Sequence, residues 1–136
     1  MVMVELNASR GEVLNAHALA ERSHLELPTV SKVLKLLVKT RLVDSYRGAN
    51  GGYRIERDAL DISVAEIIAA IEGPIAMTEC SAEEGLCAQE ENCSLRGNWQ
   101  RISIAIAKAM EGVSLAEMAQ PANPVTSPLH ITTLNT

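Results

Sequence analysis

The residues best suited to chemistry are three cysteines, Cys80, Cys87 and Cys93, the only thiols in the 136-residue chain. Six residues separate the first two and five separate the last two. An odd number of cysteines does not suit a disulfide framework. The sequence also lacks the tight Cys-x2-Cys pairs typical of structural zinc sites. Thiolates spread along one loop suit an iron–sulfur cluster, which is larger than a single ion. The spacing favours a metal ion or cluster, and the alternative is three free or redox-active thiols.

A second chemical feature is a basic segment within an acidic chain. The net charge is -5. Residues 22–57 nevertheless carry eight Lys and Arg against three Asp and Glu, a local charge of +5, which leaves -10 for the rest. A local positive field can bind phosphate even where the whole protein is acidic. We therefore expect this segment to contact double-stranded DNA.

The elements that carry the basic residues form a recognisable order. Asn15 is a suitable N-cap for a helix over residues 16–23. Pro28 suits the start of a second helix, which extends over residues 29–40 with apolar side chains at helical spacing. Two strand-like stretches, 42–47 and 53–56, then flank a glycine-rich turn and predict a β-hairpin. Helix, turn, helix and hairpin is the order of a winged helix-turn-helix.

In that fold the polar side of the second helix enters the major groove, while the hairpin, or wing, approaches the backbone or minor groove. The residues predicted to contact DNA are Pro28, Thr29, Ser31, Lys32 and Lys35 on the helix, and Arg47, Asn50 and Gly51 on the wing. The alternative is a solvated helix face and an ordinary hairpin in a domain that binds protein.

The remaining sequence suggests a link, a loop, a long helix and a tail. Ser63 and Glu66 form a capping-box pattern before a helix over residues 64–72. A long helix follows the cysteines, and its apolar stripe predicts a homodimer interface that includes Trp99, Ile102, Ile106 and Met110. The expected organisation is a winged helix-turn-helix DNA-binding domain at 1–74, a cysteine-bearing cluster loop at 75–94, a dimerisation helix at 95–119 and a disordered tail at 120–136. The fold class is mostly α with a small β-hairpin.

Several classes of protein are excluded by the sequence. No apolar run approaches the length of a membrane span, and the first residues are too short for a signal peptide, so we expect a cytoplasmic protein. None of the common phosphate-binding, zinc-protease or hydrolase motifs is present, so we do not expect an enzyme.

The two features together, in this order, resemble the IscR/NsrR-type winged-helix regulators that sense iron–sulfur clusters. The resemblance rests on residues 27–34 (LPTVSKVL), 47–53 (RGANGGY), 64–68 (VAEII) and 72–75 (EGPI), then the three cysteines and residues 97–99 (GNW). Residues 73–80 and 96–99 are most similar to the branch that regulates SUF-type cluster assembly. The resemblance implies a homodimer that binds a palindromic promoter site, a [2Fe-2S] or [4Fe-4S] cluster held by the three cysteines, and repression of cluster assembly genes.

The fourth cluster ligand stays open. IscR-type members have a histidine where this chain has Arg96, and NsrR-type members use an acidic residue from a region that lies before the start of this chain. The candidates are Glu5, Glu79, Glu90, Glu91 or a residue in a missing N-terminal segment. Two alternative functions also remain: a nitric-oxide or redox sensor of the same architecture, and a zinc-bound or metal-free winged-helix scaffold for protein interaction.

Overall fold

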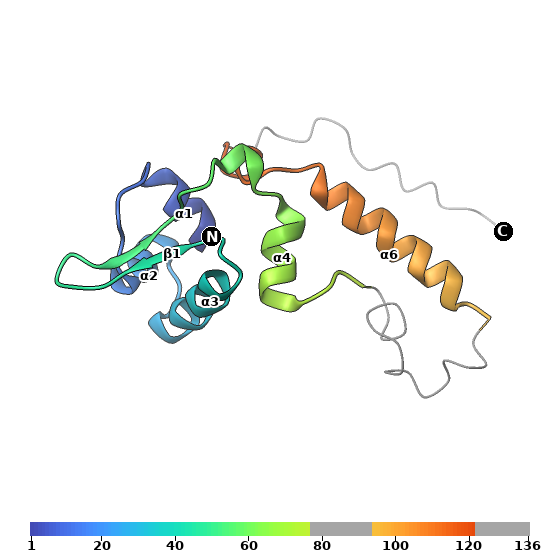
Figure 1. Cartoon of the computed structure of the whole chain (residues 1–136), viewed down its shortest axis with the longest axis horizontal. Helices are drawn as coiled ribbons and strands as arrows, with labels where there is room; N and C mark the ends of the chain where they lie inside the picture. Colours follow the sequence, from blue (N-terminus) through green and yellow to red (C-terminus); the bar gives the residue numbers. More distant parts are fainter. Residues whose placement is uncertain (77–93, 122–136) are drawn as a thin grey trace.

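A computed structural model describes residues 1–76 and 94–121 (Figure 1). Its elements are α1 (Val2–Ala8), α2 (Ala16–Ser23), α3 (Leu27–Lys39), β1 (Asp44–Tyr46), β2 (Gly52–Arg54), η1 (Ala59–Asp61), α4 (Val64–Glu72), α6 (Arg96–Glu111) and α7 (Leu115–Met118). The prediction of a mostly helical fold with one small hairpin is confirmed. In the described part of the chain, no helix is both long and apolar enough to cross a membrane.

The core lies where α1, α2 and α3 meet. The apolar stripe of α3 is fully buried at Val30, Leu34 and Leu37, and Leu19 of α2 is buried against it. The core also holds residues from other elements: Val2, Met3, Leu6, Leu42, Val43, Ile62 and Leu115. All of these side chains are aliphatic, so the core is built almost entirely without aromatic rings.

The hairpin is shorter than the sequence suggested. β1 and β2 pair antiparallel, with Ser45 opposite Tyr53. Leu42 and Val43 were expected in the first strand, but their backbone N–H groups donate to the Leu37 carbonyl at 3.0 and 3.3 Å. Both side chains are buried in the core, so these residues complete the end of α3 instead of extending the sheet. The Tyr53 backbone also pairs with Leu14, through bonds of 2.8 and 3.0 Å, which ties the hairpin to the segment before α2.

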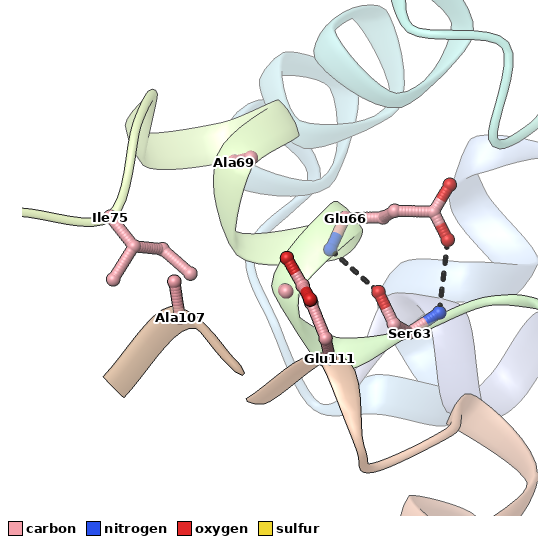
Figure 2. A pocket seen from close by; sticks show the side chains of 7 residues that line it. Ser63, Glu66, Ala69, Ile75, Ala107 and Glu111 are labelled. Atoms are coloured by element: carbon pink, nitrogen blue, oxygen red, sulfur yellow. Dashed lines mark hydrogen bonds between the residues drawn. The ribbon is translucent and has the colours of Figure 1, made fainter. Parts of the chain in front are cut away.

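Two helices start from one short antiparallel bridge. Val64 N–H donates to the Val113 carbonyl and Leu115 N–H donates to the Ile62 carbonyl, both at 2.8 Å. Ser63 and Ser114 face each other in this bridge, and each is the N-cap of a complete capping box, for α4 and α7 respectively. Figure 2 shows the reciprocal bonds between Ser63 and Glu66 at the start of α4. The capping box expected at Ser63 is confirmed.

The long helix α6 points away from the winged part of the molecule, with α4 between the two (Figure 1). α4 packs on α3 on one side and on α6 on the other. The segment predicted at 95–119 as a dimerisation helix contains two helices, α6 and α7. Helix α7 packs on α1 and η1 and buries Leu115. Most of the tail predicted at 120–136 lies outside the described residues.

Candidate nucleic-acid interface

Helix α3 presents a polar face at its start because its apolar stripe faces the core. Pro28, Thr29, Lys32 and Lys35 are exposed, and Ser31 is half-buried. The helix begins at Leu27, two residues earlier than predicted, so Pro28 is its second residue. All five residues predicted for this helix therefore lie within it, and four of them are open to solvent.

The turn between α2 and α3 fixes the direction of that face. Asn15 Oδ1 accepts a hydrogen bond from Ala18 N–H at 2.8 Å, as an N-cap of α2 should. At the other end of α2, His24 adopts the left-handed conformation with φ of 55°. Leu25 N–H then bonds back to the Ala20 carbonyl at 3.1 Å. The closed helix end leaves a connection of only three residues, 24–26, before α3 begins.

The tip of the wing is an exposed turn that requires glycine. Arg47 and Asn50 are exposed there, and Gly51 is half-buried. Gly51 N–H donates to the Gly48 carbonyl at 2.9 Å. A Cβ at Gly51 would overlap the backbone of Tyr46 and Arg47, so a side chain at this position would open the turn.

The cations of this surface are free to meet phosphate. Within residues 1–76 and 94–121 the ion pairs are Arg54–Glu56 and Arg57–Glu66. Lys32, Lys35 and Arg47 form no ion pair with a described residue. Unpaired lysine and arginine side chains can each neutralise a DNA phosphate and release its counterion.

Arg57 stabilises the fold by linking two elements. Its guanidinium donates to Glu66 at 3.0 Å and to the Asp61 carbonyl at 2.8 Å, which joins the exit of the hairpin to α4. The Ser63 backbone N–H, and then Arg57, hold the pKa of Glu66 below its ordinary value. Glu66 therefore stays ionised at neutral pH, where it keeps both the capping box and this link.

A hollow separates α4 from α6. A cavity of about 280 Å³ is lined by Ser63, Ala65, Glu66, Ala69, Ile75, Ala107 and Glu111 (Figure 2). Ser63 and Glu66 are already hydrogen-bonded to each other there, and most of the other lining residues are small and apolar. The hollow therefore lies between two helices that also pack on each other.

The predicted cluster ligands Cys80, Cys87 and Cys93 lie outside the described residues, as do Glu79, Glu90 and Glu91. Glu5 is half-buried in α1. In the parts of the chain that are described, no three His, Cys, Asp or Glu side chains gather closely enough to hold a metal ion. In the sequence the three cysteines fall between α4, which ends at Glu72, and α6, which begins at Arg96.

Helix α6 exposes apolar side chains in this single chain. Of the four predicted interface residues, Ile102 is 44% exposed, while Trp99, Ile106 and Met110 are half-buried. Leu95 and Ile104, which the predicted interface did not include, are more exposed still, at 55% and 54%. Their apolar character was visible in the sequence, but the arrangement of α6 and α4 decides which side of the helix is left open.

A compact pair of helices with an exposed polar face, followed by a glycine-tipped hairpin, defines a winged helix-turn-helix DNA-binding protein. The sequence profile of the Rrf2 family, described as an iron-dependent transcriptional regulator, matches residues 1–121. The chain belongs to the Rrf2 family.

Named relatives agree with this assignment. The chain is 33% identical over 120 residues to the HTH-type transcriptional regulator IscR of Xenorhabdus nematophila, which covers 88% of this chain and 72% of that protein. It is also 33% identical over 120 residues to a putative HTH-type transcriptional regulator of Haemophilus influenzae, with 88% and 79% covered.

Solved structures show the same fold. IscR of T. potens is similar with a TM-score of 0.63 and 28% identity, over 90% of this chain and 85% of that one. CymR, the global cysteine regulator of B. subtilis, is similar with a TM-score of 0.66 and 26% identity, over 90% of both chains. The chain is thus a DNA-binding transcriptional regulator of the IscR type and not an enzyme, as the sequence predicted.

Proposed function

We propose that this regulator is a cytoplasmic, iron–sulfur-dependent repressor of cluster assembly genes. The observation that carries the proposal is the group of three cysteines placed between α4 and α6 in a chain that matches an iron-dependent regulator family over residues 1–121. Cysteine thiolate is the ligand that iron–sulfur clusters use most often. IscR-named relatives support the same assignment.

Cys80, Cys87 and Cys93 are the residues that would hold the cluster, as [2Fe-2S] or [4Fe-4S]. A bound cluster would supply a redox-active group that is lost or altered when iron, oxygen or nitric oxide levels change. The chain's own contribution is the path from that stretch to DNA. α4 ends where the stretch begins, and it packs directly on the recognition helix α3.

On the DNA side, Thr29, Ser31 and Lys32 would reach base edges in the major groove. Lys35 and Arg47 would contact phosphate, with Asn50 and Gly51 bringing the wing close to the backbone. Two copies, joined through α6, would place two recognition helices on a palindromic site. The exposed apolar residues of α6 support this arrangement because a large apolar surface on a long helix usually has a partner.

The first test is anaerobic reconstitution followed by iron, sulfide and absorbance measurements. We expect near-equal iron and sulfide and a coloured protein, and we expect alanine at any of the three cysteines to lower the iron content and change the spectrum. Ser94→Ala is the matched control, because Ser94 adjoins Cys93 and is exposed. A cysteine variant with full iron content and an unchanged spectrum would remove that residue from the ligand set.

The second test is DNA binding to a duplex selected by the protein from a random pool. Lys32→Ala and Arg47→Ala should each weaken binding, and Arg47→Ala, which removes a proposed phosphate contact, should also flatten the salt dependence by about one unit of slope. Loss of a base contact should instead cost about 1–3 kcal/mol and relax the preference at one position. Wild-type affinity in both variants would contradict the proposed docking.

A sensor that works by thiol oxidation without a cluster is the second candidate. It is favoured by the similarity to CymR, the global cysteine regulator of B. subtilis. A colourless protein whose DNA binding changes with thiol oxidation would support it. One zinc per chain without DNA binding would instead support the protein-interaction scaffold.

A further inference from the structure

The outer face of the hairpin carries a charged cluster that the predicted DNA contacts do not include. In the β1–β2 register, Asp44 lies opposite Arg54 and Tyr46 lies opposite Gly52. Alternate residues of a strand point to opposite faces. Tyr53 and Ile55 pack against the core, so Asp44, Tyr46, Arg54 and Glu56 share the outer face. Arg54 is the one cation among them.

Arg54 is held by its two neighbours on this face. Its guanidinium lies 4.9 Å from the centre of the Tyr46 ring and donates to Tyr46 Oη at 2.9 Å. It also forms an ion pair with the Glu56 carboxylate, which accepts a further hydrogen bond from Tyr46 Oη. The Arg54 and Glu56 side chains remain 34% and 49% exposed. These bonds lower the pKa of Glu56, with Tyr46 as the larger cause and Arg54 next, so the carboxylate is ionised at neutral pH.

The charged cluster on the outer face of the hairpin lies next to the part of the wing that approaches DNA. Tyr46 immediately precedes Arg47, and Gly52, opposite Tyr46, closes the glycine-rich turn. Arg47 has no ion-pair partner among the described residues, whereas Arg54 has Glu56. The wing therefore presents two arginines of different kinds: one free to meet phosphate and one already neutralised.

We propose that Glu56 sets the DNA affinity of the wing by holding Arg54 away from the phosphate backbone. The inference rests on the DNA-binding function of the fold. Glu56 and Tyr46 together keep Arg54 engaged on the hairpin, so the wing contributes the charge of Arg47 alone. Glu56 is thus an affinity-determining residue that does not itself contact DNA.

The test measures binding of the full chain to a random-sequence duplex at salt concentrations from 50 to 200 mM. A non-specific duplex suffices because phosphate contacts do not depend on sequence, and each one adds about 0.9 to the slope of log K against log salt. We expect Glu56→Gln to release Arg54 and steepen the slope by about 0.9. The gain in affinity should then be about 3.5-fold larger at 50 mM than at 200 mM.

Two further variants show whether Arg54 carries the effect. Arg54→Ala alone should keep the wild-type slope, because Arg54 makes no phosphate contact in the wild-type protein. Arg54→Ala combined with Glu56→Gln should return the slope of the single Glu56 variant to the wild-type value. If Arg54→Ala alone flattens the slope by about 0.9, Arg54 already contacts phosphate, and the inference is wrong.

Asp44→Asn is the matched control. It removes one negative charge from the same face, but Asp44 forms no ion pair with a described residue. Its slope should stay at the wild-type value. A change equal to that of Glu56→Gln would mean that overall charge, and not release of Arg54, governs binding, and would overturn the inference. Iron and sulfide are measured in the same preparations, so that a failure of this inference can be distinguished from a failure of the proposal about the iron–sulfur cluster.

Discussion

Replacing Leu115 with alanine tests whether the short last helix belongs to the core of the winged domain. Leu115 is 1% exposed, and its backbone N–H donates to the Ile62 carbonyl at 2.8 Å. Full burial of a leucine side chain stabilises a protein by about 1.5–3 kcal/mol, and the cavity left by truncation adds to the loss. We therefore expect the free energy of unfolding to fall by about 2.5–5 kcal/mol, a large part of the roughly 5–15 kcal/mol typical of a domain.

The assay is urea denaturation of both proteins at the same concentration, followed by circular dichroism. Met118→Ala is the control on the same helix, because Met118 is 57% exposed and its truncation should cost well under 1 kcal/mol. A Leu115→Ala protein as stable as the Met118→Ala protein would refute the placement of α7 in the core.

Two more predictions concern α4 and α6. Glu66→Gln should lower stability at neutral pH by about 0.5–1 kcal/mol, since the exposed ion pair adds little to the capping box. Because the folded-state pKa of Glu66 is lowered, its contribution is present above the unfolded pKa and is lost as pH falls through the folded pKa. The difference in melting temperature between wild type and Glu66→Gln should therefore shrink in acid. Glu72→Gln, at the other end of α4, is the control. A difference in melting temperature that does not change with pH would contradict the role assigned to Glu66. Ile106→Asp in α6 should yield monomers by sedimentation, with Lys108→Asp on another side of the helix as control; a variant that stays dimeric with wild-type melting would place the interface elsewhere.

Local patterns in the sequence were sufficient to predict most of the helices. The capping residues Asn15, Ser63 and Ser114 act through bonds to residues three positions away, so their role is visible in a short window. The stripe of α3 was equally clear, because helical spacing alone determines which side chains share a face.

Contacts between distant segments could not be read in this way. Leu42 and Val43 look like the start of a strand, yet their backbone N–H groups bond to the end of α3 and their side chains are buried in the core. The pairing of Leu14 with Tyr53 depends on how two elements pack. The charged cluster of Tyr46, Arg54 and Glu56 needed the hairpin register, although the alternation of strand residues was a usable signal.

The bridge at Ser63 and Ser114 also affects which insertions and deletions the chain can tolerate in evolution. The chain between Val64 and Val113 starts and ends at this one bridge, so the cysteines fall within a loop of the chain that is closed at its two ends. The entropic free-energy cost of closing such a loop rises only with the logarithm of its length, by about 0.6 kcal/mol for each doubling. Insertions or deletions between Glu72 and Arg96 therefore cost the DNA-binding core little. The length of this segment can therefore vary while the DNA-binding core keeps its structure.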